Sequence, residues 1–297
     1  MASDAPSKCD SCGMKGSCNT SKCQDNESEQ ERQARLLLQS RLGRIKHKIV
    51  VMSGKGGVGK STVAVNLAVS LMLAGKRVGL MDVDIHGPSI PTMLGLEQEY
   101  PKPAGNGAIL PIQMGDMKVM SVGFFLQNHD DAIVWRGPMK NTAITQFLRD
   151  VEWGDLDYLI IDSPPGTGDE PLSVIQIIGN NNLDGAVVVT TPQRVAAVDV
   201  RKSISFCRLM ELPVLGVVEN MSGFACPNCN TVTPILQTGG GKKIAQDMNV
   251  PFLGAIPMDP KIVEASDGGR AFVQHYAESA TAKVMREIVK PFEEMKK

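Results

Sequence analysis

The segment IVVMSGKGGVGKST spans residues 49–62. It joins an apolar run, typical of a strand buried on both faces, to a glycine-rich loop, and the helical stretch Lys60–Ala74 follows. The loop satisfies the pattern G-x-x-x-x-G-K-[ST], in which backbone N–H groups close around phosphate oxygens and the helix N-terminus adds positive charge. The sequence therefore predicts a nucleotide-binding loop made by Gly54, Lys55, Gly56, Gly57, Val58, Gly59, Lys60, Ser61 and Thr62.

Short apolar runs alternate with helical stretches after this loop. We expect strands at Ile49–Met52, Val78–Val83, Met117–Val122, Tyr158–Ile161, Ala186–Thr190, Val214–Val218 and Phe252–Ala255. We expect helices at Lys60–Ala74, Met139–Arg149, Val195–Met210, Lys242–Met248 and Ala280–Glu294. Such alternation predicts an α/β fold with a doubly wound, mostly parallel sheet. With the nucleotide-binding loop after its first strand, the fold expected is that of a P-loop NTPase.

Ligands bind at the carboxyl ends of the strands in this architecture, and acidic residues follow two of the predicted strands. We expect Lys60 to reach the β- and γ-phosphates of ATP and the Ser61 hydroxyl to bind Mg²⁺. Asp162 ends an apolar run and is expected to hold Mg²⁺ directly or through water. Asp82 and Asp84 lie at the end of a second apolar run, and Asp82 is expected to support the residues around the metal ion. An Asp at the end of a strand can also be only the cap of the next helix.

The composition limits the other classes of function. The 297 residues carry 31 basic and 32 acidic side chains, a net charge of −1, so a general electrostatic attraction to nucleic acid or to an acidic membrane is not indicated. Aromatic residues amount to only 4 %, too few for a stacking platform on single-stranded nucleic acid. The N-terminal segment MASDAPSKCDSC lacks the pattern of a secretory signal, which predicts a cytoplasmic protein.

Six of the seven cysteines form two clusters. Cys9, Cys12, Cys18 and Cys23 lie in a segment with almost no apolar side chains, and such a segment needs a ligand to become ordered. Cys226 and Cys229 form a CPNC pair. In a reducing compartment, clusters of this kind predict metal or redox sites rather than disulfides. We therefore divide the chain into a cysteine-rich metal-binding tail (1–24), a linker or short helix (25–47) and the nucleotide-binding domain (48–297).

The motifs together resemble one known family. Lys55, near the start of the loop KGGVGKS, is the mark of deviant Walker A ATPases of the SIMIBI, MinD/ParA-like class. Four further segments resemble the Mrp/Nbp35 branch of iron–sulfur cluster carrier proteins: Asp84–Ser89, Arg136–Met139, Pro164–Glu170, and Cys226–Cys229 shortly after Glu219–Ser222. The resemblance covers about residues 35–297.

The resemblance implies roles for three polar side chains. Lys55 would reach across a dimer to the partner's nucleotide and stabilise the charge of phosphoryl transfer, as an arginine finger does. Asp84 would orient or activate the attacking water. Asn220 would read adenine through its amide. Lys55, Lys60, Asp84 and Asp162 are then the expected catalytic residues of a slow ATPase, and a homodimer, or a heteromer with a related ATPase, is the expected assembly.

Ligand counting leads to the same assembly. Cys226 and Cys229 give two thiolates per chain, whereas a [4Fe–4S] cluster takes four Cys ligands. Two CPNC loops across a two-fold axis would supply four, so we expect a bridging cluster there; a dithiol redox pair or a zinc loop remains an alternative. The tail cysteines are expected to hold a second [4Fe–4S] cluster or zinc. Of the other candidates, His47 is expected at the surface of the linker and Cys207 in the core.

Three functions compete at this stage. The first is an ATP-dependent scaffold that assembles a labile [4Fe–4S] cluster at a dimer interface and transfers it to apo iron–sulfur proteins, with no nucleic acid or membrane partner. The second is a positioning ATPase on membrane or DNA, in which the run Val284, Met285, Ile288, Val289 and Phe292 lies on a membrane; Pro291 is expected to interrupt this helix. The third is an electron-transfer ATPase similar to the nitrogenase iron protein.

Overall fold

The computed structural model describes residues 28–85, 87–105, 107–125, 137–226, 228–229 and 231–295. The cysteine-rich tail (1–24), His86 and Arg136 lie outside the described residues. Among the described residues, no helix is long and apolar enough to cross a membrane.

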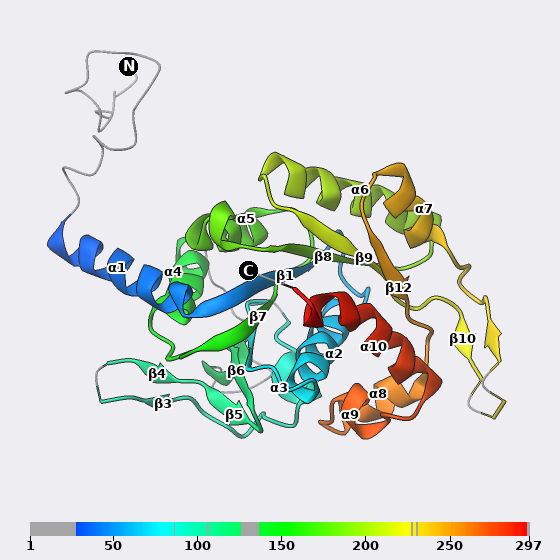
Figure 1. Ribbon diagram of the computed structural model, residues 1–297, viewed down its shortest axis with the longest axis horizontal. Helices are drawn as coiled ribbons and strands as arrows, with labels where there is room; N and C mark the ends of the chain where they lie inside the picture. Colours follow the sequence, from blue (N-terminus) through cyan, green and yellow to red (C-terminus); the bar gives the residue numbers. More distant parts are fainter. Residues whose placement is uncertain are drawn as a thin grey trace, which may run out of the picture.

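An eight-stranded sheet in the order β12-β9-β8-β1-β7-β2-β6-β5 forms the centre of the molecule (Figure 1). Neighbouring strands pair in parallel except β5 and β6, which pair antiparallel. The strands are β1 Ile45–Ser53, β2 Val78–Asp82, β5 Ile112–Met114, β6 Met117–Ser121, β7 Leu156–Asp162, β8 Gly185–Thr190, β9 Val214–Glu219 and β12 Phe252–Ala255. The predicted doubly wound, mostly parallel sheet is thereby confirmed.

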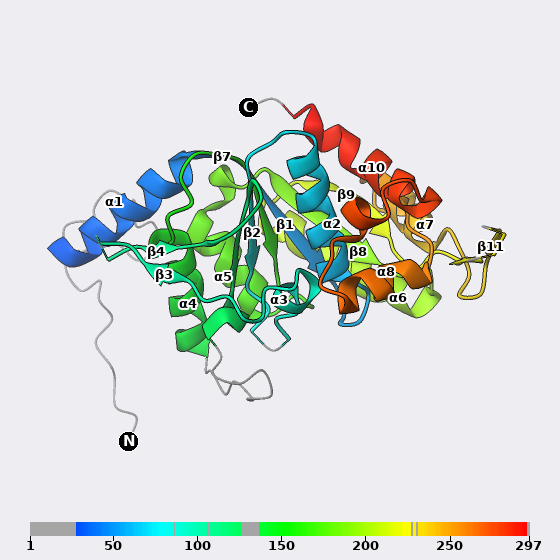
Figure 2. The same cartoon turned by 90° about the horizontal axis from the view of Figure 1, so that it is seen from below.

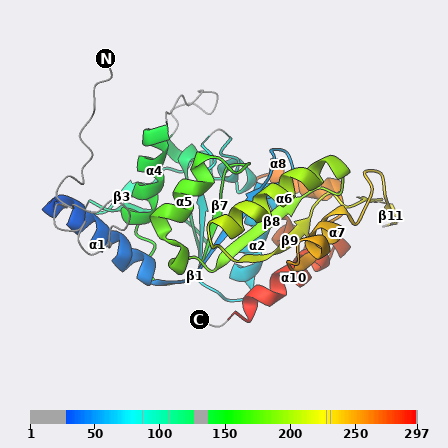
Figure 3. The ribbon, with the colours of Figure 1, turned by 90° about the horizontal axis from the view of Figure 1, so that it is seen from above.

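Helices cover both faces of this sheet. One face carries α2 Lys60–Leu73, α3 Ile90–Met93, α8 Pro260–Asp267, α9 Phe272–His275 and α10 Ala280–Glu293 (Figure 2). The opposite face carries α4 Gly137–Arg149, α5 Asp169–Ile178, α6 Arg194–Leu209 and α7 Gly240–Asp247 (Figure 3). The helix α1, Glu29–Gly43, packs on α4 and leads into β1. Because the sheet is covered on both sides, the central strands carry long buried apolar runs, such as 49–52 of β1 and 158–161 of β7.

All seven predicted strands and all five predicted helices are present, with shifts at their ends. The largest shift is at β1, which begins at Ile45 rather than Ile49. His47 therefore lies inside the sheet and is buried, so the expectation of a surface histidine is wrong. Its Nδ1 atom lies 2.8 Å from Oδ1 of Asp184, and its ring stacks on Tyr158 at 5.0 Å.

The helix α10 differs from the interfacial helix that a membrane-positioning ATPase would need. It continues through Pro291 to Glu293 instead of being interrupted there. Met285, Ile288 and Phe292 are buried, and the helix contacts α2 and β12. The apolar side of α10 is therefore used inside the molecule, which removes the structural basis of the membrane alternative.

Two small antiparallel ladders were not predicted. Lys102–Pro103 (β3) pairs with Ile109–Leu110 (β4), and Phe224–Ala225 (β10) pairs with Val232–Thr233 (β11). The second ladder forms a hairpin that projects from the body next to β12 (Figure 1). This hairpin carries Cys226 and Cys229 in the segment between its two strands. We call residues 224–233 the cysteine hairpin.

Candidate functional site

The phosphate-binding loop connects β1 to α2, as the motif requires. Gly57 and Gly59 have φ angles of 75° and 79°, in the left-handed region that favours glycine. Space around the loop is also restricted: a Cβ atom on Gly54 would lie 2.5 Å from the backbone of Asp199, and one on Gly59 would lie 2.2 Å from Nδ2 of Asn220. The loop is thus held against α6 on one side and the end of β9 on the other.

Lys60 faces two carboxylates at the carboxyl ends of neighbouring strands. Its Nζ atom lies 2.7 Å from Oδ1 of Asp162 and 3.7 Å from Oδ2 of Asp84. Lys60 Nζ also lies 3.4 Å from Oγ of Ser61. The structure therefore brings together Lys60, Ser61, Asp84 and Asp162, four residues that the sequence placed in one site.

Burial shapes the charge state of the acidic cluster. Asp162 is fully buried, and burial raises its pKa while the ammonium of Lys60 opposes the shift. Asp82 pairs with Asp162 in the β2–β7 register and is also fully buried; burial, with the nearby Asp162, raises the pKa of Asp82 to about 8. Its carboxylate accepts hydrogen bonds from Asp84 N (3.0 Å) and Ser121 Oγ (2.9 Å). Asp82 therefore fixes the backbone that carries Asp84.

One atom of this cluster has the properties of a cation ligand. Oδ2 of Asp162 is buried and has no hydrogen-bond partner among the described residues. A buried carboxylate oxygen without a partner is costly, and oxygen ligands are those that Mg²⁺ prefers. The adjacent Ser61 hydroxyl supplies a second oxygen. The residues present thus fit Mg²⁺, which Ser61 and Asp162 would hold.

Two adjoining cavities lie over the loop. One, of about 420 Å³, is lined by the phosphate-binding loop, Asp84 and Pro165, and Lys55 also lines it. The other, of about 730 Å³, is more apolar and is lined by Asn220, Met221, Phe224 and the segment 257–264. Gly59, Thr62, Ile262, Val263 and Asp267 line both. Their linings suit a ligand with an anionic end on the loop and a less polar end near Asn220.

Asn220 lies beside the phosphate-binding loop. It follows β9 and is buried, and its Nδ2 donates to the carbonyl oxygen of Val58 at 2.9 Å. Its backbone N–H donates to Thr190 O at 2.7 Å. The side chain therefore joins the end of β9 to the phosphate-binding loop and lies at the wall of the larger cavity.

Sequence reasoning missed one wall of both cavities. The helix α8 supplies Ile262, Val263 and Asp267. A signal for it was present: Asp259 caps the helix through a hydrogen bond from Lys261 N at 3.0 Å, and Pro260 occupies the first turn. The helix is only eight residues long and has no long apolar run, so a search for helical periodicity does not detect it.

The cysteine hairpin holds both thiols of the CPNC pair. Cys226 is half-buried, its N–H donating to Thr231 O at 3.0 Å, and Cys229 is exposed. The Sγ atom of Cys229 lies 3.3 Å from Oγ1 of Thr231, and the hydrogen bonds from Thr231 and Cys226 lower the pKa of Cys229. A lowered pKa favours the thiolate, which is the form that binds metals. Cys207, in contrast, is fully buried against Met52, and burial raises its pKa to about 12, as expected of an inert thiol.

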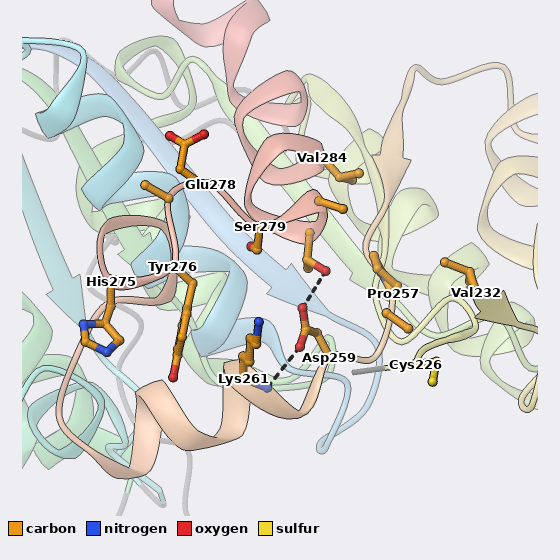
Figure 4. Close-up of a pocket in the computed structure, with 14 residues that line it drawn as sticks. Cys226, Val232, Pro257, Asp259, Lys261, His275, Tyr276, Glu278, Ser279 and Val284 are labelled. Carbon is orange, nitrogen blue, oxygen red and sulfur yellow. Dashed lines mark hydrogen bonds between the residues drawn. The ribbon is translucent and has the colours of Figure 1, made fainter. Parts of the chain in front are cut away.

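A third cavity, of about 630 Å³, lies between the cysteine hairpin and the helices α8 to α10 (Figure 4). Cys226 and Val232 lie on one side of it, and His275 and Tyr276 lie on the other. Asp259 lines both this cavity and the larger of the two cavities over the loop, which we call the nucleotide cavity. It also accepts a hydrogen bond from Thr281 Oγ1 at 2.7 Å. The segment that carries Pro257 and Asp259 is therefore a wall shared by the cavity at Cys226 and the nucleotide cavity.

Known proteins resemble this chain in sequence and in structure. Residues 44–292 match the family model described as ParA, NUBPL iron-transfer P-loop NTPase. The iron–sulfur cluster carrier protein of Methanocaldococcus jannaschii is 48 % identical over 289 residues, which cover 96 % of this chain and 97 % of that protein. A Trichoplax adhaerens homologue of the cytosolic Fe–S cluster assembly factor NUBP2 is 52 % identical over 256 residues, 85 % of this chain and 96 % of that protein.

A solved structure shows the same fold. The nucleotide-binding protein of Archaeoglobus fulgidus, in complex with ADP, is 40 % identical and aligns with a TM-score of 0.70 over 80 % of this chain and 92 % of that chain. These matches confirm the resemblance that the motifs indicate. The chain belongs to the ParA family described as NUBPL iron-transfer P-loop NTPases.

Proposed function

We propose that this protein is an ATP-dependent iron–sulfur cluster carrier, which assembles a labile [4Fe–4S] cluster between two subunits and transfers it to apoproteins. The observation that carries the proposal is the cysteine hairpin: it holds Cys226 and Cys229, and its Phe224 lines the nucleotide cavity while Cys226 lines the adjoining third cavity. The names of the relatives from Methanocaldococcus and Trichoplax support it over a positioning ATPase or an electron-transfer ATPase. We infer a cytoplasmic location, which the name of the Trichoplax relative states for that protein.

The number of thiols supports a shared cluster. Among the described residues, no group of three or more His, Cys, Asp or Glu side chains could hold a metal ion. One hairpin supplies two thiols, and a [4Fe–4S] cluster takes four Cys ligands. Two hairpins meeting in a homodimer, or in a heteromer with a related chain, would complete the set. The exposure of Cys229 leaves one thiol of each pair accessible for such a contact.

The nucleotide site supplies the residues for slow ATP hydrolysis. The loop N–H groups and Lys60 would bind the phosphates, Asp84 would orient the attacking water, and Asn220 would contact the base. Mg²⁺, held by Ser61 and Asp162, would neutralise charge on the phosphates. Lys55 is half-buried and lines the smaller cavity over the phosphate-binding loop. It would contact the nucleotide of the partner subunit and stabilise the charge of phosphoryl transfer.

The tail cysteines are proposed as a second metal site. Cys9, Cys12, Cys18 and Cys23 provide four thiolates in a short segment, enough for one [4Fe–4S] cluster or one zinc ion. Such a site would precede α1, which packs on α4 of the nucleotide-binding domain and leads into β1.

Anaerobic reconstitution with iron and sulfide tests this function. The wild type, the double variant Cys226→Ser/Cys229→Ser and a chain in which the four tail cysteines are serine would be compared by iron and sulfide counts and Mössbauer spectroscopy. We expect the hairpin variant to lose about one cluster per dimer, and the wild type to transfer that cluster to an apo-acceptor. Binding of zinc without sulfide in all three proteins would contradict the proposal.

A further inference from the structure

Glu219 is a buried carboxylate at the end of β9 that the nucleotide chemistry does not use. It is fully buried, and among the described residues no Lys, Arg or His pairs with it. Its partners are polar groups from both ends of residues 222–241, a segment that leaves the sheet and contains the cysteine hairpin. We call this segment the excursion. Oε1 accepts from Ser222 Oγ at 2.5 Å and from Gly239 N at 2.8 Å, and Oε2 accepts from Gly241 N.

These hydrogen bonds come from opposite ends of one loop. Ser222 lies where the chain leaves the sheet toward the cysteine hairpin, and Gly239 and Gly241 lie where it returns into α7. The N-cap residue of α7, Gly239, has no side chain to cap the helix, so Glu219 satisfies its first N–H groups instead. One carboxylate therefore holds the outgoing and the returning ends of residues 222–241 together.

The backbone at this base is strained, which makes the hydrogen bonds important. Met221 and Gln237 are non-glycine residues with φ angles of 57° and 73°. Left-handed conformations of such residues persist only when the surroundings impose them. Gly223, with φ of 78°, cannot carry a Cβ atom, which would lie 2.8 Å from Val232 of the returning strand. Both ends of the excursion thus turn sharply next to Glu219.

The position of Glu219 also connects the hairpin with the nucleotide site. The next residue, Asn220, contacts Val58 of the phosphate-binding loop. After Ser222, backbone pairing continues from Met258 N to Gly223 O (2.8 Å) and from Ala225 N to Met258 O (2.9 Å), and Met258 lines the larger nucleotide cavity. The base of the hairpin is therefore bonded on one side to Glu219 and on the other to a wall of the nucleotide cavity.

We propose that Glu219 is the positioning residue of the cysteine hairpin: by closing the base of residues 222–241, it sets where Cys226 and Cys229 lie relative to the nucleotide site. The role in cluster binding rests on the function proposed above, whereas the closure itself does not. Loss of one of its hydrogen bonds should loosen the excursion and leave the sheet unchanged.

Hydrogen exchange of the full chain tests the closure directly. We expect Ser222→Ala and Glu219→Gln to speed amide exchange in peptides covering 221–241 by about tenfold, with less than about twofold change in β1 and β7. Glu287→Gln, the same substitution at an exposed site on α10, should change neither. An equal increase in all peptides would show a merely structural role, and an unchanged hairpin in the Ser222→Ala protein would overturn the proposal.

A second measurement addresses the thiols. In the chain with serine at the four tail positions, cluster loss to an iron chelator should be about tenfold faster for Ser222→Ala than for the parent, while ADP affinity stays the same. Equal rates of loss would overturn the positioning role. If the parent binds no cluster at all, the function proposed above fails, and the exchange experiment still decides whether Glu219 closes the base.

Discussion

At Gly59 the phosphate-binding loop approaches the end of β9 so closely that only a hydrogen atom fits between them. In Gly59→Ala the new Cβ would lie 2.2 Å from Asn220 Nδ2, and the φ angle of 79° would itself strain an alanine. With strain of about 1–3 kcal/mol and a displaced Asn220, we expect ADP affinity to fall about tenfold or more in calorimetry. Gly43→Ala is the control, since a Cβ there meets open space; a similar loss in that variant would show that the effect is not local.

Gly59 also shows which features of the site could be predicted from the sequence and which could not. The spacing of Gly54, Lys60 and Ser61 predicted the loop because phosphate binding requires those residue types in that order. Nothing in the spacing could show that Gly59 meets Asn220, since that contact depends on the β8–β9 register. His47 failed for the same reason: its burial follows from the pairing of β1 with β7, in which it lies opposite Tyr158, a residue distant in sequence.

The cysteine hairpin is the element in which thiol chemistry depends on a neighbouring side chain. The Thr231 contact lowers the pKa of Cys229, so Thr231→Val should raise that pKa and reduce the thiolate fraction near neutral pH. We expect alkylation of Cys229 at pH 7.5 to slow about threefold, with equal rates restored at high pH. Mass spectrometry of the modified hairpin measures this in the chain with serine tail positions. Thr233→Val, on the exposed strand β11, should leave the rate unchanged; equal slowing there would contradict the assignment.

The helices and strands that could be predicted from the sequence are those whose burial produces a clear apolar pattern. The strands β1, β7 and β8 are apolar on both faces because helices cover both, so runs such as Val187–Val189 were sufficient. The cysteine hairpin and α8 lack that pattern. Two-residue strands carry little periodicity, and α8 buries only Ala265 fully. These two less regular walls of the site were therefore among the elements that sequence reasoning missed, together with α5 and β5.

The stability of the whole molecule should depend on pH through Asp157, which joins β7 to two neighbouring strands. Its carboxylate accepts from Arg77 N at 2.9 Å and pairs with the Arg77 guanidinium and with Lys46 Nζ at 2.8 Å. The hydrogen bonds from Arg77 hold the pKa of Asp157 well below its usual range. A depressed folded-state pKa stabilises the fold above the unfolded pKa of about 4, and this stabilisation is lost as the pH falls.

Asp157→Asn should therefore lower the free energy of unfolding by about 1–2 kcal/mol at pH 7, and the difference from wild type should shrink below about pH 4. Urea denaturation at several pH values measures it. Asp116→Asn, at an exposed turn, should give no pH-dependent difference. A gap for Asp157→Asn that stays constant down to pH 3 would show that the carboxylate charge is not the cause.

Assembly of two chains gives the sharpest test of Lys55, because a residue that acts in trans can be supplied by another subunit. Lys55→Ala keeps its own Lys60 with the contact to Asp162, whereas Lys60→Ala loses that contact but can offer Lys55 to a partner. Each variant alone should be inactive as an ATPase. Mixed in equal amounts they form heterodimers with one complete site, so about one quarter of wild-type activity should return. If Lys55 acted within its own chain, no heterodimer would contain a complete site and the mixture would stay inactive. The double variant Lys55→Ala/Lys60→Ala, mixed with Lys55→Ala, is the control that must restore nothing.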